Sequence, residues 1–300
     1  TLGANYTASV FGLAITIRIV RARTALPLTA VFVLLGAVLQ GQPGIQTYAA
    51  PAPQTVQAAF IVSLAPALTL WLTATLGLPI SATQAVVGAA AGLALAHGHA
   101  PWATLAKLGT SWALAPLGAM ALAVALYLAF GRLVERWLRG WRAYGLFLKL
   151  GFLAVGSYGA YALGANNVAN VAGVWVGSGA LTPEQGAWWG ALAIGAGVVT
   201  YSGRVIDTLG RKLTHLDPFP AFIAVLSNAI VLHAYAALGV PVSASQAMVG
   251  AVLGIGLVKG VRTIQRRTVL KVLLAWFVVP LVTGSLAVAL GWAARLAPGA

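Results

Sequence analysis

Two short polar phrases in this sequence have residue types and spacing that could bind a small anion. "PISATQ" begins at residue 79 and "PVSASQ" at residue 241, each after a glycine-containing break. Proline is favoured in the first turn of a helix, so the polar positions are expected around a helix start. A helix N-terminus offers free N–H groups and a partial positive charge, and nearby hydroxyls complete an anion cradle. The candidate residues are Ser81, Ala82, Thr83 and Gln84 in the first phrase and Ser243, Ala244, Ser245 and Gln246 in the second.

The hydroxyl groups in these phrases also have a structural alternative. Serine and threonine can cap a kinked helix or bridge neighbouring helices without touching a ligand. A single copy would favour that reading. The repetition of proline, serine, alanine and glutamine in both phrases favours the binding site.

A second pair of phrases places side-chain amides inside apolar surroundings. "LGANYTASVFG" (residues 2–12) matches "LGANNVANVAG" (residues 163–173). An unpaired polar group in lipid costs several kcal/mol, so these amides must bond to the backbone, to one another or to a ligand. The amides are Asn5, Asn166, Asn167 and Asn170. The first three are candidate binding residues. The alternative is a structural role, in which the asparagine side chains stabilise a break in the helix.

The two phrases recur at nearly one offset, 162 residues for the serine phrase and 161 for the asparagine phrase, which indicates an internal duplication. The chain is 60% hydrophobic and 7% charged, and apolar runs long enough to cross a bilayer recur along it. The runs are continuous rather than alternating, so a β-barrel is disfavoured. We expect ten apolar segments, five per half, at residues 1–20, 25–41, 55–77, 79–97, 103–131, 146–176, 185–202, 218–239, 241–258 and 268–293.

The basic residues predict that the two halves are inverted relative to each other. Arg18, Arg21 and Arg23 follow the first segment, whereas the matching connection of the second half is nearly neutral. At the fourth connection the first half is neutral and the second half is basic. If basic loops are cytoplasmic, the halves have opposite orientations. We therefore expect an all-α multi-pass protein of a prokaryotic inner membrane, with broken helices at the midplane. Its predicted parts are a first inverted repeat (1–131), a basic cytoplasmic linker (132–145) and a second inverted repeat (146–300).

Composition and motifs argue against several other classes of protein. The net charge of +14 sits in short clusters between apolar runs, as membrane topology requires, so nucleic acid is not an expected partner. The absence of cysteine excludes thiol chemistry and disulfides, and the four histidines form no metal-ligand pattern. No Walker sequence or nucleophile elbow is present, so neither ATP-driven transport nor a membrane-embedded enzyme is supported. Asp217, just before Pro218, is predicted to cap a helix start.

At these phrases the sequence resembles the PiT family of inorganic phosphate transporters, which includes sulfate permease relatives. That family has a duplicated GANDVANA-like signature and a duplicated P-[IV]-S-[ST]-T-H-A-like signature. "GANNVANVAGVWVGSGALT" (residues 164–182) is the closest match, "GANYTASVFG" is a weaker copy, and "PISATQA" and "PVSASQA" match the second signature. The resemblance implies that a tetrahedral oxyanion is held at Asn5, Ser81, Thr83, Asn166, Ser243 and Ser245.

The sequence departs from this family at positions that bear on substrate and coupling ion. Tyr6 and Asn167 stand where the family has aspartate, and Gln84 and Gln246 replace its histidine. Phosphate at neutral pH carries a proton and suits a site with an acceptor, whereas sulfate requires donors throughout. A cradle of N–H groups, hydroxyls and amides without a carboxylate favours sulfate over phosphate, although serine and asparagine can also accept.

We therefore expect a secondary transporter that binds the oxyanion near the midplane and works by alternating access. Import of an anion against an inside-negative potential costs about 2.3 kcal/mol per charge per 100 mV, so a driving cation is needed. With the family aspartates absent, the expected coupling ion is a proton and no organic cofactor is needed. The main alternative is a sodium-coupled phosphate transporter with sodium at Asn5, Asn166 and backbone carbonyls; an anion channel is a further one. Membrane lipid and a second copy in a C₂ homodimer, the commonest assembly, are the other expected partners.

Overall fold

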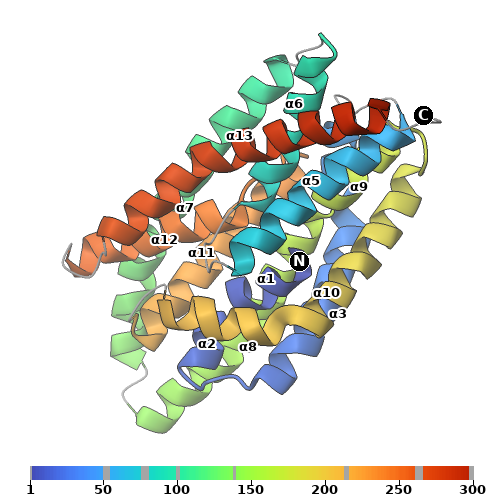
Figure 1. The fold of residues 1–300 in the computed structure, drawn as a ribbon. Helices are drawn as coiled ribbons and strands as arrows, with labels where there is room; N and C mark the ends of the chain where they lie inside the picture. Colours follow the sequence, from blue (N-terminus) through green and yellow to red (C-terminus); the bar gives the residue numbers. More distant parts are fainter. Residues whose placement is uncertain are drawn as a thin grey trace.

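Helices form all of the regular structure in the residues that the computed structural model describes, which are 2–49, 55–75, 81–98, 102–137, 140–212, 216–260 and 266–296 (Figure 1). The first half contains α1 (Leu2–Val10), α2 (Gly12–Thr16), α3 (Ala22–Gln40), α4 (Gln42–Ala49), α5 (Val56–Thr75), α6 (Ala82–Ala96) and α7 (Trp102–Trp137). The second half contains α8 (Trp141–Asn167), α9 (Ala169–Gly177), α10 (Pro183–Lys212), α11 (Pro218–Ala237), α12 (Ala244–Lys259) and α13 (Arg266–Leu296).

Six helical segments of the described chain are long and apolar enough to cross a membrane. They are Ala22–Gln40, Val56–Thr73, Trp102–Val134, Trp141–Gly177, Pro218–Ala237 and Leu273–Ala294. The apolar helices α6 and α12 are shorter, with 15 and 16 residues, and begin at the repeated serine phrases. The chain is therefore a multi-pass membrane protein in which short helices accompany full spans, as predicted.

The helix boundaries differ from the predicted segments in several places. The first predicted segment is divided into α1 and α2, and the sixth into α8 and α9. The connection after Gly41 contains the additional helix α4. Helices α7 and α8 extend into the stretch predicted as a linker, and α10 continues to Lys212 through a predicted loop. Charged residues do not by themselves end a helix, so hydropathy locates the apolar part of a helix rather than its ends.

The two halves pack against each other in a reciprocal pattern. Helix α6 lies along α13, and its repeat-mate α12 lies along α7 (Figure 1). In the same way α1 packs on α10, while α8 packs on α3. An approximate two-fold relation between the halves requires this pattern. If one helix of the first half packs on a second helix of the other half, then the repeat-mates of these two helices must also pack on each other. The fold is thus a pair of interlocked repeats.

Matched glycines let the short helices approach their partners closely. A Cβ added at Gly88 of α6 would lie 2.4 Å from the carbonyl oxygen of Pro280 in α13. A Cβ added at Gly250 of α12 would lie 2.0 Å from the carbonyl oxygen of Pro116 in α7. Both distances are far below a van der Waals contact, so only glycine fits at these two crossings.

The same relation holds for the helices that carry the asparagine phrases. A Cβ at Gly3 would lie 2.1 Å from the carbonyl oxygen of Ile194, and one at Gly164 would lie 2.0 Å from that of Val33. The two glycines and the two oxygen-bearing residues are each separated by the offset of the repeat. The duplication found in the sequence is therefore also present in the atomic contacts.

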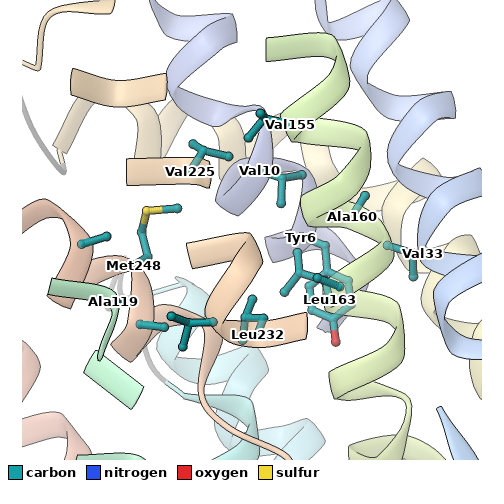
Figure 2. Packing of buried hydrophobic residues seen from close by; sticks show 14 of the residues in the cluster. Tyr6, Val10, Val33, Ala119, Val155, Ala160, Leu163, Val225, Leu232 and Met248 are labelled. Carbon is teal, nitrogen blue, oxygen red and sulfur yellow. The ribbon is translucent and has the colours of Figure 1, made fainter. Parts of the chain in front are cut away.

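The core lies between α1, α8, α11 and α12. Figure 2 shows Tyr6 and Val10 of α1 close to Val155 and Leu163 of α8, with Leu232 of α11 beside them. All five are buried. This apolar packing encloses the first asparagine phrase and holds it against the second half.

Helices α11 and α12 form an antiparallel hairpin that is closed by an ion pair. Asp217 occupies the N-cap position of α11, as predicted, but its side chain makes no capping hydrogen bond. It pairs instead with Lys259 at the end of α12. Ser243, at the start of α12, lies toward the other end of the hairpin from this ion pair.

Candidate functional site

Ser81 and Ser243 cap their helices in the same way. Their backbone angles are φ −86°, ψ 114° and φ −81°, ψ 112°. The Ser81 Oγ accepts a 3.2 Å hydrogen bond from the Gln84 N–H, and the Ser243 Oγ accepts a 3.3 Å bond from the Gln246 N–H. The predicted helix starts are confirmed at both phrases. The prediction that proline occupies the first turn is wrong for Pro241, because the serine cap sets the start of α12 after it.

Capping leaves donors available at both helix starts. Because each Oγ acts as an acceptor in the cap, its O–H can still donate. The Ser243 and Ser245 hydroxyls are 3.1 Å apart. The first N–H groups of a helix, here including those of Ala82 and Ala244, have no partner within the helix. Each start therefore presents N–H and O–H donors together with the positive end of the helix dipole.

Asn166 fixes the backbone that leads to Ser243. Its Oδ1 accepts a 3.1 Å hydrogen bond from the Val242 N–H, and its Nδ2 donates a 2.7 Å bond to the Val242 carbonyl. The side chain is 1% exposed. This two-point pairing satisfies both backbone polar groups of a residue that lies outside any helix. Asn166 thus connects the asparagine phrase to the serine phrase within the second half.

The other amides extend this network to the first half. The Asn167 Oδ1 accepts bonds from the Nδ2 atoms of Asn166 (3.2 Å) and Asn170 (3.0 Å). The Asn170 Nδ2 also reaches the Thr83 Oγ1 at 3.2 Å, and that hydroxyl donates to the Val242 carbonyl at 3.4 Å. The start of α6 is therefore joined to the start of α12 through buried amides.

Three buried oxygen atoms at this site have no hydrogen-bond partner in the protein. They are the Oε1 atoms of Gln84 and Gln246 and the Oδ1 of Asn170. A buried acceptor without a partner costs about 1–3 kcal/mol, and such groups are rare in native structures. A bound donor or cation would satisfy them. Within the described residues, the site contains no carboxylate, lysine, arginine or histidine.

Most of the predicted site residues come together. Thr83, Asn166 and Asn167 belong to one hydrogen-bonded group around Val242, and Ser243 and Ser245 adjoin it because they follow Val242 in the chain. Ser81 caps the neighbouring helix start, and Gln84 and Gln246 follow one turn along. The backbone of Asn5 lies in α1, but its side chain is outside the described residues.

Two members of the group were not among the predicted site residues. Asn170 lies on the same helical face as Asn166 and Asn167, and their spacing of three and four positions is a sequence signal that would have identified it. Tyr48 of α4 directs its hydroxyl to the Thr83 carbonyl at 3.5 Å. No local pattern marks this tyrosine, because it reaches the site through tertiary packing.

Comparison with known proteins agrees with this architecture. The model of the phosphate transporter family matches residues 2–148 and 139–287, and so covers both halves. The chain belongs to this family. Its members are transporters rather than enzymes.

Individual relatives match nearly the whole chain. A Methanocaldococcus jannaschii protein, provisionally named a phosphate permease, is 29% identical over 94% of this chain and 89% of its own length. The sulfate permease CysP of Bacillus subtilis is 27% identical over 95% of this chain and 82% of its own. A solved structure described as the sodium-dependent phosphate transporter has a TM-score of 0.85, with 19% identity, over 98% of this chain and 95% of the other. The last comparison establishes the shared fold.

Proposed function

We propose that this protein imports sulfate together with protons by alternating access, with the anion held between the starts of α6 and α12. The observation that carries the proposal is the neutral hydrogen-bonding group at these helix starts. The resemblance places the family aspartate at Asn167, and here that position is an amide that accepts from two neighbouring amides. A carboxylate is therefore not needed to complete the group.

Sulfate suits this arrangement because every one of its oxygen atoms accepts hydrogen bonds. The helix starts supply N–H groups, two serine hydroxyls and the dipoles of α6 and α12. Each buried donor that faces a sulfate oxygen is satisfied, so binding leaves none of these donors unpaired. The absence of a fixed negative charge among the described site residues also removes the usual ligand for sodium, which favours the proton as the driving ion.

The unpaired oxygens favour the alternative of phosphate transport. Hydrogen phosphate carries an O–H group, which could donate to the Oε1 of Gln84 or Gln246. Sodium bound by these oxygens would satisfy them as well. For sulfate, the same amides must turn to present their NH₂ groups, which glutamine does by rotation about its last side-chain bond. Substrate competition therefore distinguishes the two candidates.

The test is uptake of labelled sulfate into proteoliposomes under an imposed pH gradient or sodium gradient. We expect the pH gradient to drive accumulation, unlabelled sulfate to compete and phosphate to compete weakly. Competition by phosphate together with a requirement for sodium would replace the lead with the alternative. Flux that never concentrates sulfate would indicate a channel.

The site itself is tested by changing both serines to glycine. Glycine at an N-cap costs only a few tenths of a kcal/mol relative to serine, so Ser81→Gly with Ser243→Gly removes the hydroxyls while leaving the caps nearly intact. We expect sulfate binding to be lost. Ser178→Ala, at the end of α9 and outside the site, is the matched control. Full affinity in the double variant would rule out this site.

A further inference from the structure

His233 of α11 is hydrogen-bonded at both ring nitrogens inside a predicted membrane span. Its Nε2 is 2.8 Å from the Gln40 Oε1 of α3, and its Nδ1 is 2.8 Å from the Tyr158 hydroxyl of α8. The rings of Tyr158 and Tyr161 meet the imidazole edge to face, with centroids 5.4 and 5.7 Å away. This cluster takes no part in the oxyanion site described above.

The hydrogen bonds can accommodate two protonation states of the ring. An amide oxygen only accepts, so Nε2 carries a hydrogen and donates to Gln40, while Nδ1 accepts from the Tyr158 hydroxyl. When a proton adds at Nδ1, that nitrogen donates to the Tyr158 oxygen and the hydroxyl hydrogen turns away. The bond to Gln40 is unchanged. Both states therefore keep two hydrogen bonds, and histidine is the side chain whose ordinary pKa lies nearest neutral pH.

The groups on neighbouring helices determine which charges the ring meets. Helix α8 supplies the phenols of Tyr158 and Tyr161, and α3 supplies the uncharged Gln40. Helix α4 contributes Tyr48, which is bonded to Thr83. Among the described side chains, the other ionisable groups on elements packed against α11 are exposed, ion-paired or at its far end. They are Lys107, Tyr127, Arg132 and Arg136 of α7, Arg142, Tyr144 and Lys149 of α8, and Lys259 of α12.

His233 lies at the depth of the serine cap. Along α11, it is as far from Asp217 as Ser243 is from Lys259 along α12, about 24 Å at 1.5 Å per residue. Because these helices form an antiparallel hairpin joined by the Asp217–Lys259 ion pair, equal distances place His233 and Ser243 at the same level. Charge on the ring would then lie at the depth of the start of α12, where the anion is proposed to bind.

The helix that follows Gln40 contacts the loop between His233 and Ser243. Gln40 is followed directly by α4, and the Thr47 hydroxyl of α4 donates to the Gly239 carbonyl in that loop. The repeat offset matches His233 with Trp71 in the first half, so the histidine occurs in one copy while the serine caps occur in both. A proton bound here would distinguish the two otherwise related halves.

We propose that His233 binds the coupling proton, held between Gln40 and Tyr158, and that the charged ring raises the affinity of the neighbouring site for a divalent anion. This inference rests on the proposed proton-coupled transport and assigns its proton-binding residue. By linkage, the bound anion raises the affinity of His233 for the proton to the same degree. The two ligands therefore bind and leave together.

The first test is His233→Gln in proteoliposomes with labelled sulfate and an entrapped pH dye. Wild-type protein is expected to accumulate sulfate about tenfold per proton carried for one unit of pH gradient. The variant is expected to lose this accumulation and the accompanying proton entry, yet to keep sulfate counterflow, which needs no net proton movement. His97→Gln is the control, because this exposed histidine lies at the end of α6.

A second variant, Gln40→Glu, covers the case in which His233→Gln fails to fold or loses counterflow. A carboxylate beside Nε2 favours the charged ring, so the upper pH limit of sulfate uptake should move up by about one unit or more. A purely structural role would leave that limit unchanged.

The outcomes separate the inference from the proposed function. If wild-type protein shows no pH-driven accumulation, proton coupling itself is wrong. If wild-type protein is pH-driven but His233→Gln still accumulates sulfate, His233 is not the proton carrier and the proposed function stands. An unchanged pH limit in Gln40→Glu would also overturn the assignment.

Discussion

The pairing between Asn166 and Val242 gives a sharp prediction for the substitution Asn166→Asp. The new side chain has the same shape, but an oxygen replaces Nδ2. That oxygen would face the Val242 carbonyl, now at 2.7 Å, and the Asn167 Oδ1, now at 3.2 Å. Two donated hydrogen bonds become contacts between acceptors. We expect the variant to be less stable and to bind sulfate weakly, because the loop leading to Ser243 loses its anchor.

The magnitude follows from the number of bonds. Each buried acceptor left unpaired costs about 1–3 kcal/mol, and a buried carboxylate adds a desolvation cost of several kcal/mol. Protonation of the introduced carboxyl restores one donor. At pH 7 this protonation costs about 4 kcal/mol, because the ordinary pKa of the group is about 3.9. The neutral acid is therefore the cheaper state, and the total loss is about 5–7 kcal/mol at pH 7.

This argument fixes the sign of the pH dependence. Burial and facing acceptors raise the pKa of the introduced carboxyl in the folded state. Stability is then best retained below the unfolded pKa, near 4, and is lost as pH rises toward the folded pKa. The loss is about 1.4 kcal/mol per pH unit in that range. The variant should therefore recover much of its stability at pH 5 relative to pH 7.

The assay is thermal unfolding in detergent followed by tryptophan fluorescence, since the chain has ten tryptophans and no cysteine for thiol dyes. Asn167→Asp is the matched control. It also buries a carboxyl, but both hydrogen bonds to Asn167 arrive at Oδ1, which aspartate retains. Asn166→Asp should be less stable than this control by about 1–3 kcal/mol, the value of one lost bond, and should depend more steeply on pH. Equal stability and equal pH dependence would refute the role assigned to Asn166.

Three further predictions follow from other contacts. Asn167→Asp should gain sodium-specific stabilisation, about 1.4 kcal/mol when sodium is tenfold above its dissociation constant, detected as a melting shift with sodium but not choline chloride. Gly250→Ala should lower the free energy of unfolding by about 1–3 kcal/mol and reduce transport, because its Cβ would lie 2.0 Å from the Pro116 oxygen. The control is Gly118→Ala on α7, where an added Cβ would have nothing within 4 Å. In the same thermal melts this control should be neutral or stabilised by up to about 1 kcal/mol. Asp217→Asn should lower stability by less than about 1 kcal/mol, since the side chain is 70% exposed, and a larger loss in urea or thermal melts would contradict a surface ion pair.

The repeat and the two helix starts could be predicted because they depend on local sequence. A serine N-cap bonds to the N–H three residues along the chain, so it does not depend on where the helix lies in the fold. Ser81 and Ser243 were therefore placed correctly at the helix starts. The duplication also needs no structural information, because it is visible as a constant offset. The fold class could also be predicted from the sequence, because an apolar stretch of about 20 residues indicates a helix that crosses the membrane.

The connections inside the site could not be predicted, because they join residues distant in the chain. Asn166 meets Val242 across 76 positions, and Thr83 meets Asn170 across 87. Tyr48 reaches Thr83 only because α4 folds as a short helix in a stretch without an apolar signal. Sequence could identify which amides needed partners, but not which atoms would supply them. The predicted repeat boundaries and the identity of the binding residues stay predictions.

The crossing of α6 with α13 has a consequence for how the protein is made. Helix α6 has 15 residues, fewer than the roughly 20 that span a bilayer alone, and its glycines are shaped to receive the backbone of α13. During synthesis α13 leaves the ribosome after every other described helix. The short helix is therefore partly solvated, or sheltered by the insertion machinery, until α13 has been made. Helix α6, which begins at the proposed anion site, therefore reaches its final packing only after α13 is in place.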